Sequence, residues 1–149
     1  MQYLIILIYL FLNFSQSHDY KNNGIEIIKP VLKMVTENGK MGAGYFTIVN
    51  NTTDIITLNG ITSNIAKKQE IHEVILENDT YKMRPVKNGL SIKPGESLVF
   101  KSKSYHVMFF NINNTHKTNE MLQATLQFDK KVSIKIMFKV LISNTSHNQ

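Results

Sequence analysis

The chain has 149 residues, a formal net charge of +6, and neither cysteine nor tryptophan. This length fits a single domain. Without cysteine the chain can form no disulfide, no thiolate zinc site, no iron–sulfur cluster and no blue-copper centre, which needs a Cys thiolate. For the same reason we expect no lipid anchor on an N-terminal cysteine.

The positive charge comes from lysines scattered along the chain, and Arg84 is the single arginine. Sites that bind nucleic acid rely heavily on arginine for base and phosphate contacts. We therefore expect no nucleic-acid partner, and we interpret the lysines as a solvated surface.

The N-terminus has the pattern of an export signal. Residues 3–12 read YLIILIYLFL, an apolar run of signal-peptide size that is too short for an ordinary membrane-spanning helix. Ser15 and Ser17 then place small residues at the −3 and −1 positions of a cleavage site. We expect residues 1–17 to be a signal peptide and residues 18–142 to form a domain outside the cytoplasm. An uncleaved membrane anchor is the alternative, since Met1-Gln2 carries no basic side chain.

From Gly24 onward, short β-branched and aromatic runs alternate with turn residues, which predicts an all-β sandwich or small barrel of about eight or nine strands. The expected strands are Ile25–Ile28, Gly44–Asn50, Ile55–Ile61, Glu70–Glu77, Tyr81–Arg84, Ser97–Phe100, His106–Ile112, Leu122–Phe128 and Val132–Val140. Single helical turns are expected at 63–68 and 119–121. Residues 143–149 should be a flexible polar tail.

One predicted hairpin brings His72 close to Met83. Its turn is Asn78-Asp79, so the numbers of paired residues sum to 157 and His72 lies opposite Pro85. Met83 is then a diagonal neighbour of His72 on the same face, within reach of long side chains.

A second pair, His106 and Met108, is spaced i, i+2 and shares one face of a strand. A thioether is a soft, uncharged ligand that favours Cu(I), and imidazole also suits copper, whereas zinc prefers cysteine, histidine and carboxylate. These patterns do not establish that the two pairs meet. In the alternative interpretation the histidines are ordinary strand residues and methionines fill the core, as expected for four others: Met34, Met41, Met121 and Met137.

The sequence resembles the PCuAC family of periplasmic copper chaperones from about Gly42 to Val140. The similarity is carried by Gly44-Tyr45-Phe46-Thr47-Ile48 with Asn50, His72-Glu73, Met83-Arg84-Pro85-Val86, Gly89-Leu90…Ile92…Pro94-Gly95 and Tyr105-His106-Val107-Met108. Ten residues separate His72 from Met83 and twenty-two separate Met83 from His106, which matches the family signature of His, Met and His-x-Met.

The resemblance implies a cupredoxin-like Greek-key β-sandwich, and a periplasmic Cu(I) site made by His72, Met83, His106 and Met108. It also implies delivery of copper to the dinuclear site of cytochrome c oxidase, in subunit II, beside a thioredoxin-like assembly factor. The chain departs from the family in lacking tryptophan, in having Tyr81 where a methionine is common, and in lacking a tail rich in His and Met. A second copper site is therefore not expected, and nothing requires more than a monomer.

Other function classes remain open at this stage. An extracytoplasmic interaction domain without metal would have the same sandwich. No residue pattern indicates an enzyme, although His18 at a mature N-terminus could chelate Cu(II) in a copper oxidase. Tyr105 is expected either to shield the copper or to pack across strands, and His116 is expected to be a solvated loop residue.

Overall fold

The computed structural model describes residues 19–143, which form eleven strands. In chain order they are β1 (Tyr20–Asn22), β2 (Ile25–Met34), β3 (Met41–Asn50), β4 (Ile56–Ser63), β5 (Ala66–Glu77), β6 (Thr80–Pro85), β7 (Leu90–Ile92), β8 (Ser97–Val99), β9 (His106–Ile112), β10 (Met121–Phe128) and β11 (Ser133–Ile142). The predicted signal peptide, His18 and all but the first residue of the predicted tail lie outside the described residues.

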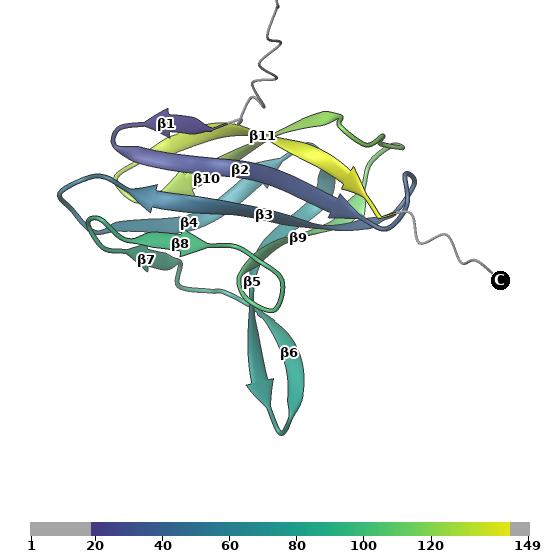
Figure 1. The fold of residues 1–149 in the computed structure, drawn as a ribbon, viewed down its shortest axis with the longest axis horizontal. Helices are drawn as coiled ribbons and strands as arrows, with labels where there is room; N and C mark the ends of the chain where they lie inside the picture. The colour runs from purple at the N-terminus through teal and green to yellow at the C-terminus, as the bar shows by residue number, and fades with distance from the viewer. Residues whose placement is uncertain (1–18, 144–149) are drawn as a thin grey trace, which may run out of the picture.

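The strands form one mixed sheet that folds over on itself into an all-β, sandwich-like body, as predicted (Figure 1). The order is β6-β5-β9-β3-β2-β11-β10-β4-β7, with β1 attached to β2 and β8 attached to β3. Every pair is antiparallel except β11 with β2, which is parallel. No helix occurs between residues 19 and 143.

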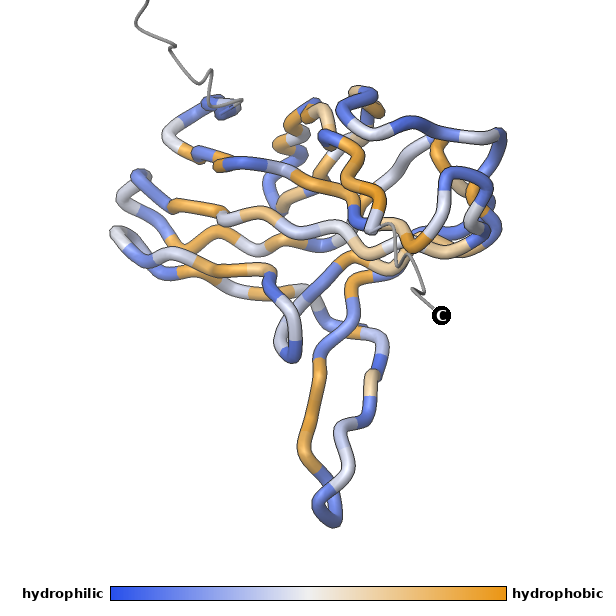
Figure 2. The backbone as a smooth tube through the Cα atoms, turned by 45° about the vertical axis from the view of Figure 1, so that its right-hand side comes forward, coloured by the Kyte–Doolittle hydropathy of each residue, from blue (hydrophilic) through white to orange (hydrophobic). Residues whose placement is uncertain are grey.

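Alternation of apolar and polar residues along the strands builds the core. In β3, Gly42, Gly44, Phe46, Ile48 and Asn50 are buried, while the residues between them are half-buried. Successive side chains of a strand point to opposite faces, so this period of two turns one face of each strand inward. The largest fully buried side chains include Phe109, Phe138, Leu32 and Ile27. Figure 2 shows the resulting hydrophobic segments along the strands of the body.

The end of β3 is fixed by a buried asparagine. The Asn50 amide donates to the carbonyl oxygens of Asp54 and Ile92, at 2.8 and 2.9 Å, and its Oδ1 accepts from the backbone N–H of Thr52 at 2.9 Å. Buried polar groups are stable only when they are hydrogen-bonded in this way. Asn50 therefore ties the end of β3 to the turn before β4 and to β7.

The hairpin formed by β5 and β6 projects away from the body (Figures 1 and 2). Its register is the predicted one, from Glu77 opposite Thr80 to His72 opposite Pro85. Asn78 and Asp79 both have positive φ, at 50° and 58°, as a two-residue type I′ turn requires. The strand β6 lies at one end of the strand order, which suits Pro85 because proline offers no backbone donor.

The structure differs from the sequence prediction in its short elements. It has eleven strands where about eight or nine were expected, because β1 and β7 have three residues each, too few to show a period of two. The two predicted helical turns are wrong. Ser63 ends β4 and β5 already begins at Ala66, while Asn119 lies in a turn with φ of 70°.

Among residues 19–143, no helix is long and apolar enough to cross a membrane.

Gly44 lies where β3 passes close to two core phenylalanines. A Cβ added there would lie 3.0 Å from ring carbons of both Phe109 and Phe138, so both rings would have to shift by a few tenths of an ångström. We predict that Gly44→Ala lowers the free energy of unfolding by about 1–3 kcal/mol, the usual cost of overpacking a core. Gly60→Ala in β4 is the matched control, since its Cβ would meet only Gln127 Oε1 at 3.6 Å. Urea denaturation of both variants checks this, and equal stabilities would contradict it.

Candidate metal centre

The two predicted histidines are direct neighbours across the β5–β9 pair. His72 and His106 are paired residues of the antiparallel register, and their ring centroids lie 5.7 Å apart. Both side chains are buried, with 9% and 5% of their surface exposed. The sequence left open whether the two His–Met pairs meet, and this register brings them together.

The two methionines lie on the same face of the sheet as the histidines. Met108 is two residues beyond His106 in β9, and it is half-buried opposite Glu70. Met83 is two residues before Pro85, the partner of His72, and it is 63% exposed on the projecting hairpin. Because paired residues in a sheet share a face and residues two apart do as well, all four side chains lie on one face.

Each imidazole has one nitrogen occupied by an acceptor. His72 Nε2 lies 3.0 Å from Glu70 Oε2, and His106 Nδ1 lies 3.2 Å from the carbonyl oxygen of Ser104. Carboxylate and carbonyl oxygens only accept hydrogen bonds, so the proton of each neutral ring is on the nitrogen facing them. His72 Nδ1 and His106 Nε2 are then left with free lone pairs.

The free nitrogen of His72 is also buried. His72 Nδ1 has no hydrogen-bond partner within the described residues. A buried polar atom without a partner costs free energy, and a metal ion bound to this nitrogen would offset that cost. Histidines that bind metals commonly donate their other N–H to a carboxylate or a backbone carbonyl, which is the arrangement seen for both rings.

Glu70 is hydrogen-bonded to the His72 ring and forms an ion pair with Lys68. Lys68 Nζ lies 2.9 Å from Glu70 Oε1. The hydrogen bond from Lys68, and after it the one from His72, lowers the pKa of the Glu70 carboxyl below its ordinary value. The carboxylate that orients His72 therefore stays ionised further into the acid range than an ordinary glutamate does.

Aromatic rings flank the histidine pair. Tyr45 from β3 lies 6.5 Å from the His106 ring, and Phe110 from β9 lies 5.9 Å from the His72 ring, measured between centroids. Of the two roles expected for Tyr105, the structure favours packing, because this residue lies against the core with its ring 6.1 Å from Phe100. Tyr45 and Glu70 were not predicted as site residues, although each lies on a predicted strand or at its end.

The donor set limits which metals can bind at this face. Between residues 19 and 143, no three His, Asp or Glu side chains come together as a metal site. The other candidate donors on the face of the two imidazoles are thioethers, and imidazole with thioether suits a soft ion far better than zinc, calcium or magnesium.

Two expectations about other residues were wrong. Met41 was expected in the core but is 51% exposed at the start of β3, whereas Met34 is buried as predicted and Met121 and Met137 are half-buried. His116 was expected to be solvated but is only 6% exposed.

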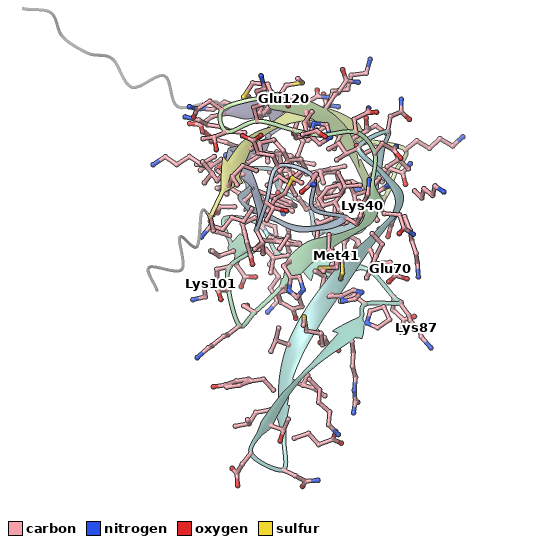
Figure 3. All side chains as sticks on the ribbon, turned by 90° about the vertical axis from the view of Figure 1, so that its right-hand side faces the viewer. Lys40, Met41, Glu70, Lys87, Lys101 and Glu120 are labelled. Atoms are coloured by element: carbon pink, nitrogen blue, oxygen red, sulfur yellow. The ribbon has the colours of Figure 1, made fainter. Side chains whose placement is uncertain are left out.

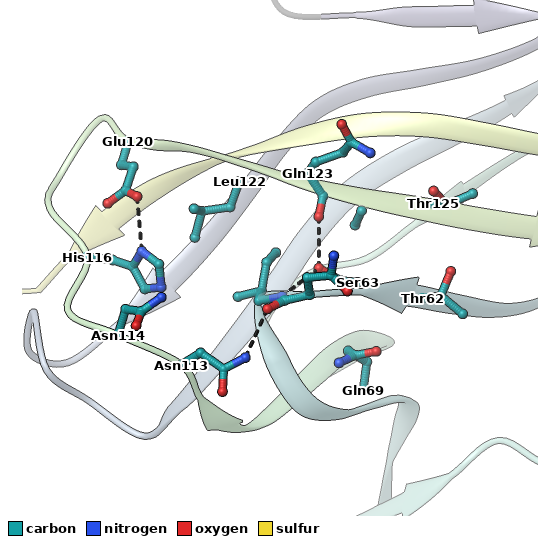
Figure 4. A pocket seen from close by; sticks show the side chains of 13 residues that line it. Thr62, Ser63, Gln69, Asn113, Asn114, His116, Glu120, Leu122, Gln123 and Thr125 are labelled. Atoms are coloured by element: carbon teal, nitrogen blue, oxygen red, sulfur yellow. Dashed lines mark hydrogen bonds and ion pairs between the residues drawn. The ribbon is translucent and has the colours of Figure 1, made fainter.

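His116 is buried in a polar groove away from the candidate metal centre. Its Nδ1 donates to Glu120 Oε1 at 3.1 Å, and Asn113, Asn114 and Gln123 also line the groove (Figure 4). None of the four predicted ligands lines this groove. The polar loop sequence around His116 did not indicate that this residue is buried. Its backbone N–H donates a hydrogen bond to the carbonyl oxygen of Glu37, a contact between distant parts of the chain.

The pKa of Glu70 gives a test of the local electrostatics. Because Lys68 is the main cause of its lowering, we predict that Lys68→Met raises the pKa of Glu70 toward its ordinary value. Lys82→Met is the matched control: it should raise the pKa of Glu77, its own partner, and leave that of Glu70 unchanged. Carboxyl chemical shifts followed over an acid titration measure both, and an unchanged Glu70 midpoint in Lys68→Met would refute this assignment.

Comparison with known proteins identifies relatives of this fold. The model of the LpqE-like family, described as LpqE-like lipoproteins, matches residues 25–140. No curated protein matches the chain. Among solved structures, the copper-bound PCuAC domain from PmoF2 has a TM-score of 0.68 and 19% identity over 84% of this chain and 98% of that domain.

Two further structures show the same fold. The apo PCuAC domain from PmoF1 has a TM-score of 0.69 and 16% identity over 84% of this chain and 99% of that domain. The Cu(I) form of DR1885 from Deinococcus radiodurans has a TM-score of 0.59 and 18% identity over 88% of this chain and 83% of that one. The family match and the shared fold lead to one conclusion: the chain belongs to the LpqE-like family, which is the PCuAC family.

Proposed function

We propose that this protein is an exported metallochaperone that holds one Cu(I) ion with His72, Met83, His106 and Met108 and passes it to another protein. In this role it is a carrier and not an enzyme, and copper is its cargo.

The observation that carries this proposal is the pair of fixed imidazoles. Each ring has its N–H bound to an acceptor and one nitrogen free, and the free nitrogen of His72 is buried without a partner. Two neutral imidazoles and two thioethers are ligands that suit Cu(I) and leave the complex with a charge of +1. Solved relatives include copper-bound PCuAC domains, which supports copper as the metal.

A carrier must also release its cargo, and the position of Met83 suits release. This side chain is 63% exposed on a hairpin that projects from the body (Figure 1). The histidines are buried in the body and supply prearranged nitrogen ligands. The exposed thioether of Met83 is therefore the ligand that is replaced first when the metal leaves the site.

We further propose that the protein works in the periplasm and delivers Cu(I) toward the dinuclear copper site of cytochrome c oxidase subunit II, with a thioredoxin-like assembly factor as a second partner. The description of the family as lipoproteins supports export. Outside the cytoplasm thiols tend to oxidise, so a site without cysteine is suited to that compartment.

The proposal is tested by titrating the protein anaerobically with Cu(I) against a chromophoric chelator. We predict one tightly bound Cu(I) per chain. Met83→Leu should weaken Cu(I) binding by at least about tenfold and His106→Ala by at least about a hundredfold. Removing a residue that only orients a ligand already lowers metal affinity by about 10–100-fold, and removing the ligand itself should lower the affinity at least as much.

Two control variants make the result specific. Met137→Leu replaces a half-buried methionine of β11, which lies two strands beyond β3, and His116→Ala removes an imidazole as buried as that of His106 from a groove that none of the four ligands lines. Both should bind Cu(I) as the unchanged protein does. An unchanged Cu(I) affinity in His106→Ala would contradict the proposed site. Absence of Cu(I) binding by the unchanged protein would instead support an interaction domain without metal.

A further inference from the structure

Besides the candidate ligands Met83 and Met108, a third methionine lies beside them on the same face of the sheet. Met41 begins β3, and 51% of its surface is exposed, although methionine is usually a core residue. In Figure 3 the Met41 and Glu70 side chains lie at the same level of the molecule, above the projecting hairpin.

The strand register places Met41 beside Met108. Met41 pairs with Phe110 and Ala43 pairs with Met108, so Met41 and Met108 are diagonal neighbours on adjacent strands. Such neighbours lie about 7–8 Å apart at the backbone, a distance that two long side chains can span. On β3 the residue directly opposite Met108 is Ala43, a small residue whose single methyl group cannot separate the two long side chains.

Side chains that can bind Cu(I) consequently lie on four adjacent strands, all on one face of the sheet. They run from Met41 on β3, through Met108 and His106 on β9 and His72 on β5, to Met83 on β6. The two outer thioethers are the exposed ones, at 51% and 63%, while both histidines are buried. The site therefore has an exposed thioether at each end.

We propose that Met41 is an exchange ligand, which binds Cu(I) together with Met108 while the ion leaves or enters the four-residue site. This inference rests on the proposed copper-carrier function. In the exchange, a lone pair of the Met41 sulfur forms a bond to copper and the bond from copper to Met83, the ligand farthest from β3, breaks. Copper stays Cu(I), no proton moves and the charge of the complex stays +1.

The test is the rate at which the Cu(I)-loaded protein gives its metal to an excess of a chromophoric Cu(I) chelator, measured by stopped flow. We expect Met41→Leu to keep the equilibrium affinity within about twofold and to slow transfer about tenfold, which corresponds to about 1.4 kcal/mol in the barrier. Met41→His should restore much of the rate, because imidazole also binds Cu(I). Met137→Leu is the control and should transfer copper at the unchanged rate.

Each result has a distinct meaning. Equal transfer rates in Met41→Leu and the unchanged protein would overturn the exchange role. A tenfold loss of equilibrium affinity in Met41→Leu would overturn it as well, because Met41 would then be a permanent ligand. If the unchanged protein fails to load with Cu(I), the proposed function has failed, and the exchange role fails with it. Thermal unfolding of each variant confirms that the fold is intact.

Discussion

The antiparallel register between β5 and β9 is the constraint on which the candidate site depends. It sets His72 directly opposite His106 and Glu70 directly opposite Met108. Side chains alternate between faces along a strand, so a slip of one residue would turn one histidine into the core and leave the other outside. The buried residues on the inner face, such as Ile71 and Val107, oppose such a slip.

The same pairing divides the site into a rigid part and an accessible part. The histidines are buried, and acceptors on Glu70 and Ser104 fix the orientation and the tautomer of both rings. Met83 lies instead on a hairpin whose second strand is exposed along its whole length. Prearranged nitrogens favour tight binding of the proposed copper ion, and an exposed thioether favours its exchange, so one sheet face serves both needs of the proposed carrier.

Local patterns were sufficient to predict part of this arrangement. The Asn78-Asp79 turn fixes the register of its hairpin, and from that register the relation between His72 and Met83 follows. The pairing of β5 with β9 joins segments more than thirty residues apart, which no turn specifies. It therefore could not be derived from spacing, and only the resemblance to a known family indicated that the four residues act together.

The mistakes concern residues whose burial depends on distant contacts. Met41 looks like a core methionine, but β3 begins at Met41, three residues before the predicted strand, and its alternation places this side chain on the outer face. His116 lies in a polar loop, and its burial arises from pairing with Glu37 and from the hydrogen bond to Glu120. Glu70 could have been noticed, since it lies two residues from His72 and thus shares its face.

In the proposed site each imidazole keeps its proton on the nitrogen that faces an acceptor and binds the metal through the other nitrogen. Nitrogen-15 NMR of the histidine rings distinguishes these two nitrogens. Cu(I) is diamagnetic, so spectra of the labelled protein can be recorded before and after anaerobic addition of one equivalent. We predict large shifts at His72 Nδ1 and His106 Nε2, protons retained on the other nitrogen of each ring, and no change at His116. Unchanged spectra, or shifts at His72 Nε2 and His106 Nδ1, would contradict it.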